Sequence, residues 1–159
     1  MEIKQCGCPE IIDSDWDLAE HTWGEKNFYS LSLPMLFHIP IGIGRRIERA
    51  MAKAQDKQYK LSDPPMVMSK DGLFSGAVMI GIERPEVADP RVISLSGAEL
   101  VSKIHTGPWK ELNKGVSELL SFLRSKKGTH PAAIYFWYVT CPECAEGETH
   151  KTVIFAQLP

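Results

Sequence analysis

The order of the expected strands and helices constrains the fold of this chain more than any other feature. A strand, a helix and a hairpin are expected within residues 33–83, and the same order returns within residues 93–158. Both helices have apolar residues at a spacing of three and four positions, which places these residues on one face. The two β-α-β-β units predict an α+β fold, in which an antiparallel sheet has both helices on one face. We expect the other face to form a groove at the pseudo-two-fold axis.

Local patterns place the elements of each unit. In the first unit, a buried strand at 32–41 precedes a helix at 41–57, and a hairpin follows at 66–82. Lys70-Asp71-Gly72 predicts the hairpin turn, because an Asp-Gly pair adopts the positive φ angles that such turns require. The elements of the second unit are a strand at 97–107, a helix at 108–127 with Gly128 just past its end, and strands at 133–140 and 151–158.

The length of the chain fits a single domain over residues 1–159. Residues 1–30 have no regular pattern apart from one helical turn within 13–23, and we expect this segment to pack on the domain. The first residues lack the basic and apolar stretches of a signal peptide. No apolar run reaches the ~20 residues that cross a bilayer. We therefore expect a cytoplasmic protein.

The charge of the chain argues against two classes of partner. A formal net charge of −2 predicts neither a basic surface for nucleic acid nor a polybasic membrane anchor. No helix-turn-helix pattern is present either, so we expect no direct binding to DNA and no binding to a membrane.

The four cysteines form two close pairs, Cys6 with Cys8 and Cys141 with Cys144. Four thiolates complete a closed tetrahedral zinc site, which would pin the N-terminal segment to the last hairpin. A redox dithiol is an alternative, but only a loop and one strand follow "CPEC", too little for a thioredoxin-like fold. Two pairs of ordinary thiols are the third possibility.

Four consecutive aromatic residues precede the second cysteine pair, in "YFWYVTCPEC". Strand alternation puts Phe136 and Tyr138 on one face, and Tyr135 and Trp137 on the other. A large core accounts for any one ring, whereas rings on both faces favour a ligand pocket. The candidate ligand-binding residues are aromatic side chains and one strand-end histidine: Trp23, Phe28, Tyr29, Phe37, His38, Trp109, Phe136, Trp137 and Tyr138.

The second half resembles the GyrI-like small-molecule-binding family, which includes effector domains of multidrug-sensing regulators. The likeness rests on "GAELVSKIHTGPWKELNKGVSELLSFL", on a strand ending in Tyr138, and on "TVIFAQLP". It implies a stand-alone binding domain with Phe136 and Tyr138 toward the ligand. Members that bind organic cations commonly have a glutamate where this chain has Phe136. Glu99, Glu146 or aromatic faces would have to replace it.

The resemblance therefore implies a protein that binds bulky, flat, apolar or cationic organic molecules, which it sequesters or senses. Some relatives are hydrolases that open strained rings, so a detoxifying hydrolase in the same groove is an alternative. Tyr138 and Glu146 are its candidate catalytic residues. A zinc-stabilised interaction module without a small ligand is a third reading.

Overall fold

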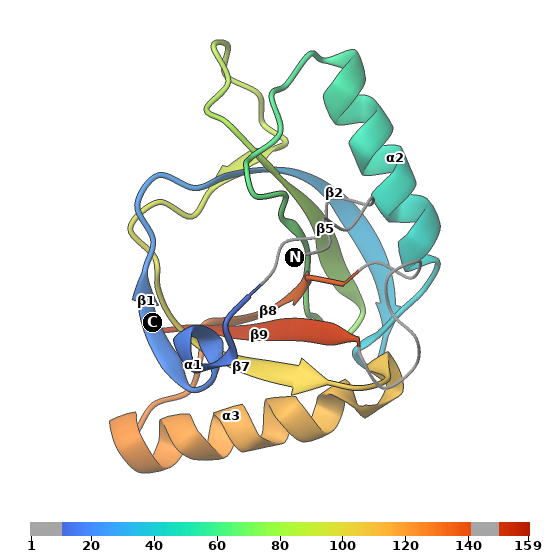
Figure 1. The fold of residues 1–159 in the computed structure, drawn as a ribbon. Helices are drawn as coiled ribbons and strands as arrows, with labels where there is room; N and C mark the ends of the chain where they lie inside the picture. The colour runs from blue at the N-terminus through green and yellow to red at the C-terminus, as the bar shows by residue number, and fades with distance from the viewer. Residues whose placement is uncertain (1–10, 141–149) are drawn as a thin grey trace, which may run out of the picture. The chain divides into compact units, whose positions relative to one another are not determined.

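The computed structural model describes residues 11–140 and 150–159. These residues adopt an α+β fold with nine strands, and all the strand pairs described below are antiparallel (Figure 1). The chain divides into two compact units, of which unit 1 comprises Met1–Thr22 with Glu99–Pro159 and unit 2 comprises Trp23–Ala98. Among the described residues, no helix has the length and apolar character needed to cross a membrane.

Unit 1 consists of four antiparallel strands in the order β1-β7-β9-β8, with the long helix α3 alongside them (Figure 1). Helix α3 ends at Gly128, whose φ of 59° is the left-handed conformation that favours glycine. The elements are α1 (Asp13–Trp16), β1 (Ala19–Thr22), β7 (Glu99–Thr106), the 3-10 turn η1 (Trp109–Glu111), α3 (Leu112–Lys127), β8 (Ala133–Tyr138) and β9 (Lys151–Gln157).

The core of unit 1 lies between α3 and one face of its sheet. Leu119 and Leu123 of α3 pack with Val101, Ile154 and Ala156 of the strands, and all five are fully buried. The predicted apolar stripe of this helix is therefore confirmed at its centre.

Unit 2 consists of strands β4, β5 and β2 in that order, with β6 and β3 pairing with opposite ends of the long β2. Its elements are β2 (Asn27–Leu36), β3 (Ile39–Pro40), α2 (Ile43–Asp56), β4 (Val67–Lys70), β5 (Ser75–Ile82) and β6 (Val92–Ser94). The predicted hairpin is confirmed, but its connection runs over four residues, 71–74, and neither Asp71 nor Gly72 has the positive φ angle that the tight turn required.

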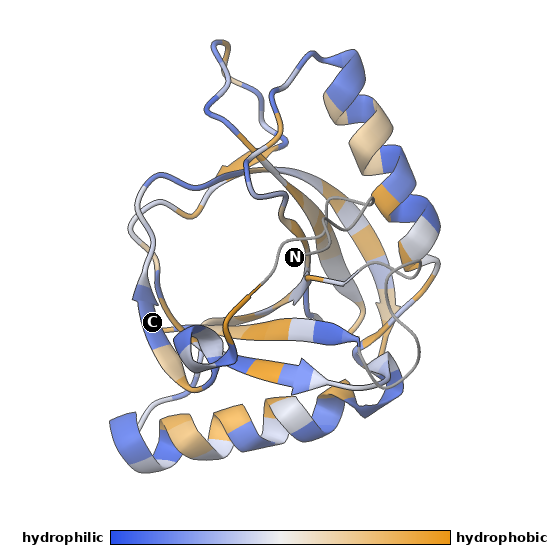
Figure 2. Ribbon diagram, in the orientation of Figure 1, coloured by the Kyte–Doolittle hydropathy of each residue, from blue (hydrophilic) through white to orange (hydrophobic). Residues whose placement is uncertain are grey.

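The core of unit 2 lies beneath α2. Ala50 and Ala54 are fully buried against Leu33, Val78 and Ile80 of β2 and β5. The expected stripe of α2 is confirmed, and the rest of this helix is predominantly hydrophilic (Figure 2).

Within residues 11–30, the expectation of an irregular segment was wrong beyond its helical turn. That turn is α1, but β1 and the start of β2 also lie within this range. Strand β1 pairs with β7 in the register His21 to Leu100, so its partner lies far along the chain. A four-residue strand with such a distant partner has too weak a local pattern to be recognised from sequence.

Candidate functional site

Four rings meet on the face of the unit 1 sheet that is turned away from α3. They belong to Trp16, His21, Trp137 and Phe155, here called the Trp16 cluster. The centroid of the Trp16 ring lies 4.8 Å from that of His21, 5.3 Å from Trp137 and 6.0 Å from Phe155. Trp137 and Phe155 stack at 6.4 Å with an interplanar angle of 14°. Trp16 therefore contacts every other member.

Strand alternation explains why these rings share a face. Phe155 lies on β9 between Ile154 and Ala156, which point toward α3, so its own side chain points the other way. Trp137 is paired with Val153 in the β8–β9 register, which makes Trp137 and Phe155 diagonal neighbours.

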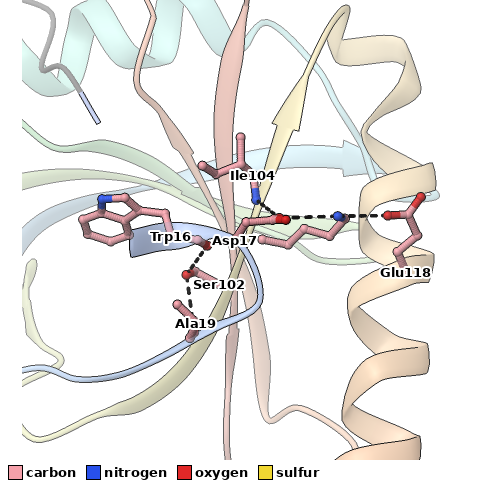
Figure 3. A network of polar contacts seen from close by, with 7 residues as sticks. Trp16, Asp17, Ala19, Ser102, Ile104 and Glu118 are labelled. Atoms are coloured by element: carbon pink, nitrogen blue, oxygen red, sulfur yellow. Dashed lines mark hydrogen bonds and ion pairs between the residues drawn. The ribbon is translucent and has the colours of Figure 1, made fainter. Parts of the chain in front are cut away.

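The hydroxyl of Ser102 holds the outer part of the cluster in place. Ser102 lies on β7, and its Oγ donates a hydrogen bond to the carbonyl oxygen of Trp16 at 2.5 Å (Figure 3). His21 Nε2 lies 2.7 Å from the same Oγ. Because the single hydroxyl hydrogen is used by the Trp16 carbonyl, the Nε2–H of His21 must be the donor in this second bond. Ser102 is thus not positioned as a nucleophile that His21 activates.

The cluster has a half-buried outer layer and a buried inner layer. Trp16 and His21 form the outer layer, and burial lowers the pKa of His21 below its usual 6.5. In the inner layer Trp137 is only 3% exposed. The Nε1–H of Trp137 has no hydrogen-bond partner among residues 11–140 and 150–159. Such a buried, unpaired donor costs about 1–3 kcal/mol.

A polar network fixes the segment that carries Trp16 to the edge of β7 (Figure 3). Asp17 Oδ1 accepts a hydrogen bond from the backbone N–H of Ile104 at 3.2 Å and lies 3.5 Å from Lys103 Nζ. Lys103 Nζ is also 2.9 Å from Glu118 Oε2 on α3. Burial lowers the pKa of Lys103, but its bonds to Glu118 and Asp17 outweigh this and raise it.

A second group of rings, the Trp109 cluster, consists of Trp109, Tyr138 and His150. The Trp109 centroid lies 5.4 Å from that of Tyr138 and 5.2 Å from that of His150. Within the described part of the chain, His150 Nδ1 and the Oγ1 of Thr152 are buried without a hydrogen-bond partner. Trp109 itself is 40% exposed, because it lies in η1 rather than on the apolar stripe of α3.

The structure corrects one assignment on β8. Phe136 was assigned to the ligand side, but it packs with Ile134 against the core beneath α3. Alternation along β8 was right, whereas the choice of face was wrong. Local sequence gives only the period of a strand, and the pairing with β9 decides which face meets the helix.

The remaining predicted ligand residues lie in unit 2. The rings of Trp23 and Phe28 are 6.0 Å apart, and Phe28 lines a cleft of about 480 Å³. Tyr29 is buried in the core beneath α2. Phe37 and His38 form a turn with positive φ angles, in which His38 Nδ1 lies 2.8 Å from Asp71 Oδ2.

Several predicted residues lie outside the described part of the chain. Glu146 and the four cysteines Cys6, Cys8, Cys141 and Cys144 belong to this group. Glu99 is described and is exposed at the start of β7. No group of three metal-binding side chains occurs among the described residues.

Four residues around the Trp16 cluster were missed from the sequence. Trp16 and His21 lie in a stretch without a clear hydrophobic period. The alternation along β7 and β9 could not distinguish Ser102 and Phe155 from ordinary core residues. The one available signal was a tryptophan within the acidic stretch "DSDWD", since a large ring is rarely left in a solvated turn.

Three solved structures have the same fold as this chain. The C-terminal domain of EcmrR has a TM-score of 0.71 at 12% identity, and the match covers 89% of this chain and 96% of that one. SAV2435 bound to tetraphenylphosphonium has a TM-score of 0.60 at 13% identity, over 88% of this chain and 92% of that one. A hydrolase encoded by lin2189 from Listeria innocua has a TM-score of 0.59 at 15% identity, over 89% and 92%.

These identities establish a shared fold and nothing more. No curated protein matches the chain. A family model described as bacterial hydrolase matches residues 1–158. The chain therefore belongs to the bacterial hydrolase family, and its fold is that of the GyrI-like effector-binding domains it resembles.

Proposed function

We propose that this protein binds bulky aromatic or hydrophobic organic molecules, cations among them, at the Trp16 cluster, and thereby sequesters or senses them. The observation that carries the proposal is the layering of this cluster, with half-buried Trp16 and His21 above buried Trp137 and Phe155. A flat ligand can stack on the outer rings without disturbing the aliphatic core. The tetraphenylphosphonium bound by SAV2435, which has the same fold, is a ligand of this chemical class.

The electrostatics of the cluster favour a cationic ligand. The faces of tryptophan and phenylalanine rings attract cations by about 0.5–2 kcal/mol per ring. Burial lowers the pKa of His21, so this imidazole is neutral at pH 7 and does not repel a cation. Ring faces would thus take the place of the glutamate that is replaced by Phe136.

The buried indole of Trp137 adds a second element of recognition. Its Nε1–H has no partner among the described residues, so an acceptor on a ligand, such as a carbonyl or phosphoryl oxygen, would gain a hydrogen bond there. The ring of Trp16 lies 5.3 Å from that of Trp137, so we expect a ligand to reach this donor by displacing the Trp16 ring.

Calorimetry with tetraphenylphosphonium and the neutral acceptor triphenylphosphine oxide tests this proposal. We expect a Kd below ~100 µM for at least one of them. Trp16→Ala should weaken binding about tenfold, the value of one lost ring contact. Phe74→Ser removes an exposed ring of unit 2 and serves as the matched control. Failure of both compounds to bind, or a loss in Phe74→Ser alone, would refute the Trp16 cluster as the site.

The family description favours hydrolysis as a second candidate function, which we assign to the Trp109 cluster. Tyr138 lies beside Trp109, and the buried Nδ1 of His150 has no described partner. In this reaction, water attacks a carbon of a strained ring, the ring bond breaks, and the leaving atom takes up the proton. Turnover of an epoxide that is lost in Tyr138→Phe, Glu146→Gln or His150→Gln but kept in Trp16→Ala would establish it. Loss in Trp16→Ala instead would place any chemistry at the Trp16 cluster.

We also propose, from the sequence pattern alone, that the two cysteine pairs bind one structural zinc ion. Metal analysis of protein purified without added zinc should find one ion per chain, and Cys141→Ser should remove it. Metal-free protein with an unchanged thermal unfolding curve would refute this site.

A further inference from the structure

Unit 2 exposes an unusual concentration of large apolar side chains at one end. They belong to the β2–β3 turn and its flanks and to the β4–β5 connection, and they are between 47% and 65% exposed. This apolar tip consists of Leu36, Phe37, Ile39, Ile41, Leu73 and Phe74. Single exposed apolar residues are ordinary on protein surfaces, whereas a group of six on two adjoining connections points to an interaction site.

Contacts between the two turns hold the apolar tip together. The rings of Phe37 and Phe74 meet edge to face at 5.6 Å. The backbone N–H of Met35 donates to the carbonyl oxygen of Phe74 at 3.0 Å, and His38 bonds Asp71 beside them. The two connections therefore lie against each other, and they bring the six exposed side chains to the same end of unit 2.

A basic surface follows directly along the chain. Helix α2 starts two residues after Ile41, and its first two turns carry Arg45, Arg46 and Arg49, here called the basic flank. Residues 43–57 contain five basic and two acidic side chains. Among the described residues, none of the three arginines forms an ion pair. Repulsion from neighbouring positive charges, above all that of Arg49, lowers the pKa of Lys53.

Helix stability does not explain the basic flank. The N-terminal end of a helix carries a partial positive charge, so Arg45 and Arg46 oppose the helix dipole. The first turn of α2 also lacks the acidic residue that would favour its N-terminus. The negative charge of an anionic partner would offset the repulsion between the arginines and the helix dipole, and it would also replace the missing acidic residue.

We propose that the apolar tip and the basic flank together dock this protein on the surface of an anionic lipid bilayer. The apolar side chains enter the boundary between headgroups and acyl chains, while the guanidinium groups bind lipid phosphates. The net charge of −2 does not reveal this surface, because it sums the local excess of arginine with the acidic residues of the whole chain. The proposal is independent of the small-molecule function.

Charge complementarity selects the bilayer over a second copy of the chain. Two copies that met symmetrically through the apolar tip would bring two basic flanks close together, and like charges across an interface are unfavourable. A bilayer containing phosphatidylglycerol supplies both an apolar layer and negative charge.

Vesicle flotation with the full chain tests the proposal. We expect binding to vesicles of equal parts phosphatidylcholine and phosphatidylglycerol, and little binding to phosphatidylcholine alone. High salt should weaken the binding, because it screens the arginine–phosphate attraction. Phe37→Ser with Phe74→Ser should reduce the vesicle partition coefficient at least about tenfold, through lost apolar burial. Arg45→Gln with Arg46→Gln should also reduce it about tenfold.

Matched controls separate this surface from general effects of charge and apolarity. Arg124→Gln with Lys126→Gln makes the same change in charge on α3, and Val87→Ser removes another exposed apolar side chain. Both controls should bind vesicles as the unchanged chain does, and circular dichroism should confirm that all variants are folded. Equal binding to neutral and anionic vesicles, or no binding, would overturn the proposal. A dimer in lipid-free solution that Phe37→Ser dissociates, without vesicle binding, would identify a self-association surface instead.

Discussion

The two faces of the unit 1 sheet are built from the same strands and differ in almost every chemical respect. Toward α3, alternate residues such as Val101 and Ile154 are aliphatic and fully buried against leucines. On the other face, the intervening residues Ser102 and Phe155 meet Trp16 and two further rings. One residue step along a strand thus separates an aliphatic core from a surface of rings and polar groups.

The two faces also differ in how completely their side chains are packed and hydrogen-bonded. The face beneath α3 packs apolar atoms against a helix of 16 residues. The other face meets a helix of only four residues, and it contains a buried indole N–H without a described partner. We infer that the face beneath α3 mainly stabilises the fold and that the other face is available to bind a ligand.

The largest effect should come from Leu119→Ala beneath α3. Leu119 is fully buried, and its truncation leaves a cavity that costs about 2–5 kcal/mol. Urea unfolding followed by circular dichroism measures the loss. The half-buried neighbour Leu120 offers a matched control, and Leu120→Ala should cost clearly less. Equal losses for the two leucines would contradict the separation of the helix into a core face and an outer face.

On the opposite face, Ser102→Ala should cost less and should act on ligand binding as well. The change leaves the carbonyl oxygen of Trp16 and the N–H of His21 without their partner, at about 1–3 kcal/mol. We expect weaker tetraphenylphosphonium binding, measured by calorimetry, because Trp16 loses its anchor. Ser125→Ala, on the exposed side of α3, is the control and should change neither quantity. An unchanged ligand affinity in Ser102→Ala would show that the anchor does not position Trp16 for binding.

The sequence predicted the parts of this fold that depend on local pattern. The stripes of α2 and α3 follow from helical spacing, and the β4–β5 hairpin follows from two short apolar runs on either side of a connection that contains glycine. Alternation also separated Tyr135 and Trp137 from Phe136. Each of these features is encoded within a few consecutive residues.

The candidate site depends instead on contacts between distant residues. Trp16 and Phe155 are brought together by the pairing of β1 with β7 and of β7 with β9, which no local period encodes. The face assigned to Phe136 failed for the same reason. Single-sequence patterns give the period of a strand, and tertiary pairing gives its orientation.

A smaller effect on the aromatic face should appear on acidification. Burial lowers the folded-state pKa of His21 below 6.5, so the unfolded chain binds a proton more readily than the folded one. Stability contributed by neutral His21 is therefore present above pH 6.5 and is lost as the pH falls through the folded pKa. Cation binding should weaken over the same range, because a protonated imidazole repels the ligand.

An NMR titration of His21 measures this pKa directly. Unfolding experiments between pH 7 and pH 5 measure its effect on stability, because this range spans the usual histidine pKa of about 6.5. His21→Gln should remove the part of the pH dependence that His21 causes. A titration midpoint above 6.5 would contradict the neutral state.

The smallest effect should follow from the ion pair that links the two faces at the edge of β7. Glu118→Gln weakens the contact with Lys103 on the α3 side, and the Glu118 side chain is 66% exposed. Solvent and salt screen such a pair, so we expect a loss of at most about 0.5 kcal/mol that disappears at high salt. Asp17→Ala should matter more, because it also removes the acceptor of the Ile104 N–H beside the Trp16 segment. If Glu118→Gln weakened ligand binding as much as Asp17→Ala, the two faces would be coupled through Lys103 rather than separate.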